Sequence, residues 1–360
     1  MKGKTRFLIR IGACAVLATA PESLCPASSQ AQANAPQYDV DVSWPKPLPS
    51  RWVLGGIGGV CVDAQDHVFL LNRQDVLDEE LTAGHLAPSV IEFDPSGNMV
   101  NSWGDPKLLD PRLHSCHVDK DSNVWIGSST SGMIQKYSHD GSKLLLQIGK
   151  KGLFDSSDGT AKGKPLNSNA AQFFMPASIF VDRQNGDVYV ADGESIGGNR
   201  RVAVIDRNGT FLRQWQPAGM ETVHCLTAAN DGLVYVCNRQ AGRIQVYDKM
   251  GKFLKNIEVP WIRYTPAREG QRRAGGGSAV ALELSRDSNQ RLMYIVNQNN
   301  AEVDIIDRET GKILANIGRG VGHYPGQFDV PHGIAVDSKG NVYVAENRGK
   351  RIQKFKIIGQ

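Results

Sequence analysis

The sequence lacks an uninterrupted run of about 18 apolar residues, the length that a membrane-spanning helix requires. We therefore predict no integral membrane span. The apolar stretch IGACAVLATA is too short to cross a bilayer, and it follows the basic stretch MKGKTRFLIR. This order is typical of a secretory signal peptide, so we predict cleavage of residues 1–33 after Ala33 and export of the protein to the periplasm or out of the cell.

The sequence also lacks a large net charge of either sign. The formal charge is +4, and removal of residues 1–33, which hold four basic residues and one acidic residue, reduces it to +1. Binding to nucleic acid requires a clustered basic surface rather than a balanced one. We therefore predict no nucleic-acid partner and expect a monomer that acts on a small-molecule or peptide substrate.

Cysteine is scarce, and two of the six cysteines lie within residues 1–33. Cys61, Cys116, Cys225 and Cys237 remain. Cys225 and Cys237 flank the turn AANDG symmetrically, which places them opposite each other in a predicted hairpin. A disulfide between them could persist in an oxidising compartment, and four buried free thiols are the alternative.

Convincing amphipathic helices are absent, and one short motif recurs instead. Its second strand is a β-branched and aromatic run that appears as VFLLN at 68, VWIGS at 124, VYVAD at 188, VYVCN at 234, MYIVN at 293 and VYVAE at 342. Each run is followed by a third strand such as RIQVYD, a turn such as DRNG and a fourth strand such as FLRQW. Six repeats of four antiparallel strands predict an all-β fold, a six-bladed β-propeller over residues 34–360.

The two ends of the chain complement each other. The last repeat stops after its third strand, RIQKFKI, while YDVDVSW at 38–44 precedes the first blade without a partner. We predict that this N-terminal strand completes the last blade, because closing the ring covers both exposed edges. Three insertions, at 73–88, 150–172 and 260–278, interrupt the repeats, and we expect them to be partly ordered over one face.

Three of the eight histidines recur in one register. Aligned on the second strands, His114, His224 and His332 open the first strands of alternate blades, at spacings of 110 and 108 residues. The corresponding residues of the other blades are Gly58, Ala177 and Val280. Because first strands line the axis of a propeller, the three imidazoles should converge. Three imidazoles with an open fourth position are the ligand set of a catalytic zinc site, and copper, iron or nickel would also accept them.

The other histidines follow no such register. We place His117 at the surface because its side-chain parity is opposite to that of His114, and His67 and His139 at the surface because they lie in turns. His85 and His323 lie in loops and are left unassigned.

Two arginines directly follow second strands, Arg73 in LLNRQD and Arg239 in VCNRQAGR. Both should point across the face that holds the histidines. A guanidinium there can bind a carboxylate through two parallel hydrogen bonds. A salt bridge at the rim is the alternative interpretation.

The segment FDVPHGIAVDSKGNVYVAENRGKRIQKF resembles an NHL repeat, and the resemblance extends from about residue 38 to the end of the chain. The histidine pattern resembles the peptidyl-α-hydroxyglycine α-amidating lyase family. That resemblance implies zinc ligation by His114, His224 and His332. It also implies substrate contacts by Arg73 and Arg239.

The sequence departs from this family at two positions. The family has a catalytic tyrosine after the Asp-Gly that ends the second strand of blade three, where VADGESIGGNR has Glu194. Glu194 is therefore a candidate base, with Tyr264 of the third insertion as a rival. The family also has an acidic residue that helps to bind calcium after the last zinc histidine, where this chain has Gly333.

The resemblance implies an exported, zinc-dependent lyase that cleaves a C–N bond in a hydroxylated substrate bearing a carboxylate. Zinc would act as a Lewis acid on the substrate hydroxyl, and a base would accept its proton. Two other functions are consistent with the sequence. One is a non-catalytic NHL propeller that binds a peptide, glycan or protein, and the other is a metal-dependent hydrolase.

Overall fold

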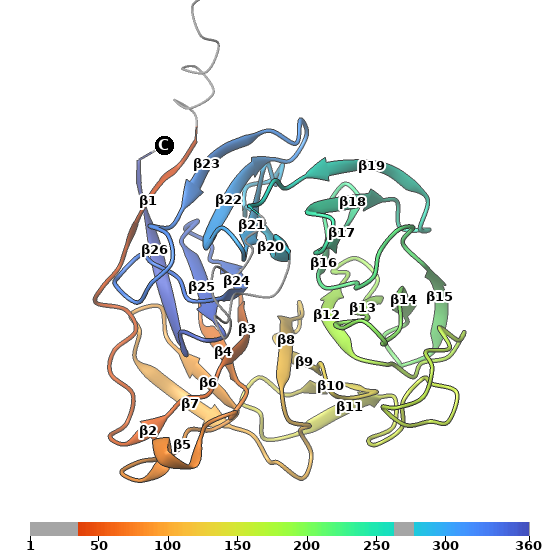
Figure 1. The fold of residues 1–360 in the computed structure, drawn as a ribbon, viewed down its shortest axis with the longest axis horizontal. Coiled ribbons are helices and arrows are strands. Elements are labelled where there is room, and N and C mark those ends of the chain that lie inside the picture. The colour runs from red at the N-terminus through yellow and green to blue at the C-terminus, as the bar shows by residue number, and fades with distance from the viewer. Residues whose placement is uncertain (1–34, 263–276, 360) are drawn as a thin grey trace, which may run out of the picture.

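The computed structural model describes residues 35–262 and 277–359. The predicted signal peptide and Tyr264 lie outside these residues. Within them, none of the helical segments is long and apolar enough to cross a membrane. The described chain forms a ring of six four-stranded antiparallel sheets around a central axis, so the predicted six-bladed β-propeller is confirmed (Figure 1).

The first three blades are continuous in sequence, apart from the first insertion. Blade one contains β3 (Ile57–Val62), β4 (Val68–Asn72), β6 (Val90–Phe93) and β7 (Met99–Trp103). Blade two contains β8 (Leu113–Val118), β9 (Val124–Ser128), β10 (Ile134–Tyr137) and β11 (Leu144–Ile148). Blade three contains β12 (Pro176–Val181), β13 (Val188–Asp192), β14 (Arg201–Ile205) and β15 (Phe211–Trp215).

The last three blades follow the same order from the axis outward. Blade four contains β16 (Leu226–Ala228), β17 (Val234–Asn238), β18 (Arg243–Tyr247) and β19 (Phe253–Glu258). Blade five contains β20 (Ala279–Leu284), β21 (Leu292–Asn297), β22 (Glu302–Asp307) and β23 (Ile313–Ile317). Blade six contains β24 (Pro331–Val336), β25 (Val342–Glu346), β26 (Arg351–Gly359) and β1 (Gln37–Val40).

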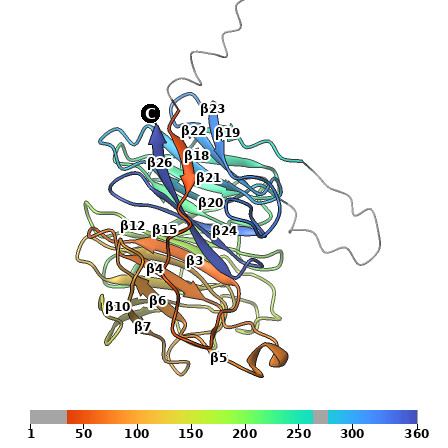
Figure 2. The same cartoon turned by 90° about the vertical axis from the view of Figure 1, so that its left-hand side faces the viewer.

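The N-terminal strand closes the ring as predicted. β1 pairs antiparallel with β26, with Tyr38 opposite Ile357 and Val40 opposite Phe355. Figure 2 shows the two strands side by side although they lie at opposite ends of the chain. The Tyr38 hydroxyl also lies 2.8 Å from that of Tyr294 in blade five. The first and last described segments therefore hold each other in place, and neither edge is left open.

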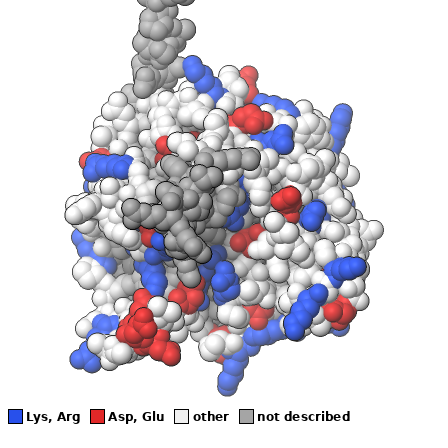
Figure 3. Space-filling view, viewed as in Figure 1, with Lys and Arg blue, Asp and Glu red and all other residues white. Residues whose placement is uncertain are grey.

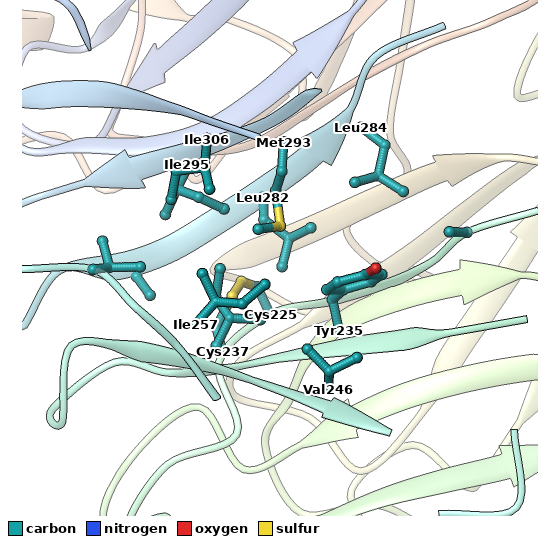
Figure 4. Close-up of a cluster of buried hydrophobic side chains, with 14 residues drawn as sticks. Cys225, Tyr235, Cys237, Val246, Ile257, Leu282, Leu284, Met293, Ile295 and Ile306 are labelled. Carbon is teal, nitrogen blue, oxygen red and sulfur yellow. A yellow bond between two sulfur atoms is a disulfide. The ribbon is translucent and has the colours of Figure 1, made fainter. Parts of the chain in front are cut away.

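The hydrophobic core lies between neighbouring blades. The second strands β4, β9, β13, β17 and β25 are buried along their whole length, because each is covered by a blade on both faces. Figure 4 shows such an interface between blades four and five, where Tyr235 and Ile257 face Met293 and Ile295. Each buried side chain of this size contributes roughly 1.5–3 kcal/mol relative to exposure, so the β-branched and aromatic runs of the repeat determine the packing.

Two disulfides lie near the axis, one within a blade and one between neighbouring blades. Cys225 pairs with Cys237 across blade four, with their Cα atoms 5.0 Å apart, and this resolves the two alternatives that the sequence leaves open. Cys61 pairs with Cys116 and thereby links β3 of blade one to β8 of blade two. No sequence pattern predicts this second bridge, because its partners lie 55 residues apart on separate blades.

The described insertions lie at the end of the blades that carries the histidines. The first contains the 3-10 helix η1 (Asp78–Leu81) and β5 (His85–Leu86), which pairs in parallel with β2 (Trp52–Val53) from the segment before blade one. The second packs through Asp155 against Asn199, just beyond β13. Most of the third lies outside the described residues. Acidic and basic side chains are interspersed over the face drawn in Figure 3.

Candidate metal centre

A β-bulge places two of the candidate histidines. The pairing of β8 with β9 shifts between Leu113 and Ser115, and the pairing of β24 with β25 shifts between Pro331 and Gly333. His114 and His332 are the extra residues at these shifts. A bulge bends its strand and redirects the side chain of the extra residue, and this feature is common beside functional sites. The shifts in blades one, three and five include Gly58, Ala177 and Val280, the positions that the sequence alignment makes equivalent.

The three histidines converge on the axis. The ring centroid of His114 lies 5.0 Å from that of His224 and 4.7 Å from that of His332. The centroids of His224 and His332 are 5.4 Å apart. All three residues are buried, with exposed fractions of 4%, 1% and 7%. The structure therefore brings together the residues that the repeat register predicts to be neighbours.

Each imidazole is oriented by a carbonyl of the following blade. Nδ1 of His114 lies 2.7 Å from the Ala177 oxygen, Nδ1 of His224 2.6 Å from the Val280 oxygen, and Nδ1 of His332 2.9 Å from the Gly58 oxygen. A carbonyl only accepts hydrogen bonds, so every Nδ1 carries a hydrogen and donates it. In the neutral imidazole the lone pair is then on Nε2, which is the arrangement that metal-binding histidines use.

Glu194 completes the cluster. Its Oε2 lies 3.0 Å from Nε2 of His114 and 2.8 Å from Nε2 of His224. These three atoms are buried and make no hydrogen bond. One ligand atom from each of the three histidines and Glu194 lies within 4.8 Å of the others, so the donor set fits a metal ion. Within the described residues, no second group of histidine, cysteine and acidic residues is arranged in this way.

The backbone that carries Glu194 is held by tight contacts. Gly193 adopts φ +148°, and a Cβ atom there would lie 1.9 Å from the Asn199 oxygen, so only glycine fits. The backbone N–H groups of Gly193 and Glu194 both donate to the Met175 oxygen, at 3.0 and 2.9 Å. This turn directs the glutamate side chain toward the axis.

A buried ionic network supports the same turn. The fully buried Arg201 donates from Nε to Asp192 Oδ2 at 2.9 Å, and its Nη2 lies 3.4 Å from Asp155 Oδ2. Asn199 donates to both carboxylates, at 2.7 Å to Asp192 and 2.9 Å to Asp155. Burial raises the pKa of Asp192, and Arg201 opposes this rise. The network fixes the end of β13, from which Glu194 extends.

The two candidate arginines lie beside the cluster. Arg73 Nε donates to the Leu113 oxygen at 3.2 Å, and its Nη2 lies 3.5 Å from Nε2 of His332. Gly58 must be a glycine, since a Cβ atom there would lie 2.8 Å from Arg73 Nε and 1.7 Å from the Leu113 oxygen. Burial lowers the pKa of Arg73 to about 10, which still leaves the guanidinium charged at neutral pH.

Arg239 is oriented by a residue that the sequence reasoning missed. Its Nη2 donates to Oε1 of Gln298 at 2.8 Å, while its buried Nε has no hydrogen-bond partner. Gln298 in turn donates to the Pro331 oxygen at 3.1 Å, next to His332. Gln298 follows the second strand of blade five as Arg73 and Arg239 follow theirs, so the repeat register could have identified it.

Burial and neighbouring charges shift the pKa values within the cluster. Burial lowers the pKa of His114, with Glu194 opposing, and burial together with Arg73 lowers that of His332 well below its usual value. Burial alone would raise the pKa of Glu194, but the adjacent imidazoles His114 and His224 hold it well below its usual value. This lowering corresponds to imidazolium–carboxylate pairs, in which protons occupy the positions that a metal ion would take.

The predicted surface position of His117 is only partly correct, because its side chain is half-buried and faces a central channel. His117 packs against Phe180 of blade three, with ring centroids 5.3 Å apart, and lines a central channel of about 450 Å³ that extends from the histidine cluster toward the opposite ends of the first strands. The bulge at His114 adds one residue to β8. The side chain of His117 therefore faces the channel, whereas strict alternation predicts that it faces away from it. Burial and the charge of Arg286 lower its pKa to about 4.

The remaining histidines lie away from the cluster. His67 and His139 are half-buried and pair with Glu92 and Asp63, so their surface placement is only partly correct. His85, which is exposed, and His323, whose side chain is 72% exposed, lie in peripheral segments. The calcium implied by the family resemblance stays a prediction, and Gly333 offers no side-chain oxygen for it.

The fold and site define a six-bladed β-propeller with a histidine–glutamate cluster at its axis. Residues 328–355 match the family model of the NHL repeat. Among solved structures, the chain is similar to virginiamycin B lyase from Staphylococcus aureus, with a TM-score of 0.55, 13% identity, and coverage of 89% of this chain and 100% of that chain. At this identity the likeness concerns the fold alone.

Three proteins of known sequence give similar matches. Peptidyl-glycine alpha-amidating monooxygenase B of Xenopus laevis is 25% identical over 351 residues, which cover 88% of this chain but only 35% of that protein. NHL repeat-containing protein 3 of Homo sapiens is 26% identical, and the match covers 88% of this chain and 84% of that protein. Peptidyl-alpha-hydroxyglycine alpha-amidating lyase 1 of Drosophila melanogaster is 25% identical, and the match covers 88% of this chain and 59% of that protein.

The chain is therefore a six-bladed β-propeller with one segment that matches the NHL repeat, and its sequence resembles the peptidyl-α-hydroxyglycine α-amidating lyases. It spans about a third of the length of the Xenopus amidating monooxygenase that it matches.

Proposed function

We propose that the protein is an exported, metal-dependent lyase that cleaves a C–N bond in a hydroxylated substrate bearing a carboxylate. One observation carries this proposal. The Nε2 atoms of His114 and His224 and a carboxylate oxygen of Glu194 converge without hydrogen-bond partners, between two largely buried arginines. The similarity to proteins named as amidating lyases supports the choice of reaction.

The residues of the cluster have distinct roles in this proposal. His114, His224 and His332 would hold the metal, with zinc favoured by the family resemblance. The metal would supply Lewis acidity toward the substrate hydroxyl. Glu194 lies where it can accept the hydroxyl proton, since its carboxylate is already within 3.0 Å of two of the imidazoles.

The bond changes balance without any further reactant. Glu194 takes the proton of the substrate hydroxyl, and the electrons of that O–H bond form a carbonyl. The neighbouring C–N bond breaks with its electron pair going to nitrogen, which receives the proton back from Glu194. The products are a carbonyl compound and an amide or amine, and neither oxidant nor water is consumed.

The charges of the site indicate the substrate class. Arg73 and Arg239 are two cations beside one carboxylate, Glu194, so the described site is electropositive before any metal binds. The free Nε of Arg239 can donate to a substrate carboxylate. An anionic group on the substrate would thus be held beside the reacting hydroxyl.

We also propose export, which rests on the N-terminal sequence pattern. The two disulfides, Cys61–Cys116 and Cys225–Cys237, support it because such bonds persist in oxidising compartments and are rare in the cytosol.

The test of the lyase activity is direct. The purified protein, loaded with zinc, is incubated with a peptide ending in α-hydroxyglycine, and glyoxylate release is measured. We expect glyoxylate from the wild type and none from His224→Ala. A zinc-loaded wild type that releases no glyoxylate would contradict the amidating-lyase activity. A new carboxylate or alcohol produced with uptake of water would indicate the hydrolase instead.

A non-catalytic propeller is the second candidate. It is motivated by the match to NHL repeat-containing protein 3, at 26% identity over most of both chains, whose name states no activity. This alternative predicts ligand binding on the histidine-bearing face that is unchanged in His224→Ala.

A further inference from the structure

We infer that Glu194 is the fourth ligand of the metal centre. The metal would then be bound by three imidazoles and one carboxylate, whereas the sequence predicts three imidazoles and an open fourth position. This inference rests on the proposed metal site but goes beyond the residue roles given above. It makes Glu194, at the position where the lyase family has tyrosine, part of the resting coordination shell.

The contacts of Glu194 show three acceptor atoms facing one another. Nδ1 of His114 and of His224 each donates to a backbone carbonyl, so in the neutral rings Nε2 has only its lone pair to offer. Both lone pairs point at Glu194 Oε2, at 3.0 and 2.8 Å. A carboxylate oxygen and an imidazole lone pair at this distance repel each other unless a positive charge, either a proton or a metal ion, lies between them.

The spacing matches a shared metal. Nitrogen and oxygen ligands lie about 2.0–2.2 Å from zinc, so neighbouring ligands of a tetrahedral site are roughly 3–3.5 Å apart. Two of the Glu194 contacts lie close to this range, and all four ligand atoms fall within 4.8 Å of one another. His114 and His224 are at least nine-tenths buried, and each directs an unpaired nitrogen into this space.

The backbone keeps the carboxylate in place. Gly193 and the hydrogen bond from Glu194 N to the Met175 oxygen fix the turn, so only the glutamate side chain can move. If a substrate hydroxyl replaced Glu194 at the metal, only this side chain would have to move. The released carboxylate would then be adjacent to that hydroxyl and free to accept its proton.

The ligand set also narrows the choice of metal. Three imidazoles and a carboxylate suit divalent ions such as zinc, iron, cobalt or nickel. Copper(I) prefers thiolate and thioether ligands, and the described cluster contains neither.

Cobalt(II) is a suitable probe because its visible absorption reports the ligands around it. The metal-free full-length mature protein is titrated with cobalt(II) in competition with a chelator, for the wild type, Glu194→Ala and Glu194→Gln. Glu283→Gln is the matched control, since Glu283 lies in the channel outside the cluster. We expect Glu194→Ala to weaken cobalt binding on the order of 10–100-fold or more and to change the spectrum. Glu283→Gln should match the wild type.

The outcomes separate this inference from the proposed metal site. Wild-type affinity and spectrum in both Glu194 variants, with binding lost in His224→Ala, would overturn the inference and leave the three-histidine site intact. Failure of the wild type to bind cobalt would contradict the metal site itself and indicate an internal ion pair between Glu194 and the imidazoles. Thermal melting of the metal-free proteins establishes folding, and Glu194→Gln, which keeps the side-chain shape, provides the test if Glu194→Ala does not fold.

Discussion

Replacement of Arg201 by methionine should destabilise the propeller strongly and in a pH-dependent way. Arg201 is fully buried and lies between Asp192 and Asp155, whose side chains are 0% and 4% exposed. Removing one partner of a buried ion pair leaves an uncompensated charge, which costs about 3–5 kcal/mol. Because the same network holds the turn before Glu194, the loss should also loosen the candidate metal centre.

The sign of the pH dependence follows from Asp192. Burial raises the pKa of Asp192 and Arg201 opposes the rise, so the variant should raise it further. A carboxyl group whose folded pKa exceeds its unfolded value stabilises the fold at low pH and loses that contribution as pH rises through the folded pKa. The destabilisation should therefore be larger at pH 7 than at pH 5.

Urea unfolding followed by tryptophan fluorescence measures this effect at both pH values. Arg319→Met is the matched control, because Arg319 pairs with Asp39 at 2.8 Å but both side chains are more than half exposed. Such a pair contributes only about 0.2–1 kcal/mol. Equal destabilisation by the two substitutions, or a larger loss at pH 5 than at pH 7 for Arg201→Met, would refute the reasoning.

Two further predictions concern the disulfides and Arg239. Replacing Cys61 and Cys116 by serine should cost roughly 4 kcal/mol of unfolding free energy, against roughly 3 kcal/mol for Cys225 and Cys237, because the closed loops span 55 and 12 residues. Urea titration checks this order, and equal losses would contradict it. Arg239→Lys should raise KM for a carboxylate-bearing substrate about tenfold or more, since lysine keeps the charge but not the planar fork. An unchanged KM would place the substrate carboxylate elsewhere.

The fold could be predicted from the sequence because the information is local and repeated. Each second strand is a short β-branched and aromatic run, and these runs specify the number of blades. Ring closure followed from two incomplete ends, and the pairing of β1 with β26 confirms it. The convergence of His114, His224 and His332 could be predicted for the same reason, since register within a repeat determines position around the axis.

The errors arose where the repeat is irregular or where contacts cross between blades. His117 was misplaced because strict alternation ignores the bulge at His114. The contact of Glu194 with two imidazoles depends on the Gly193 turn, whose direction no pattern specifies. The Cys61–Cys116 bridge joins separate blades, and sequence spacing carries no information about such a pair.

The central claim is that His114, His224 and His332 hold a metal. The most direct measurement is the metal content of the purified mature protein by elemental analysis, beside His332→Ala and the control Glu283→Gln. We expect about one equivalent of a divalent transition metal in the wild type and the control, and a large loss in His332→Ala. A wild type without bound metal after incubation with zinc, or a His332→Ala variant with undiminished content, would contradict it.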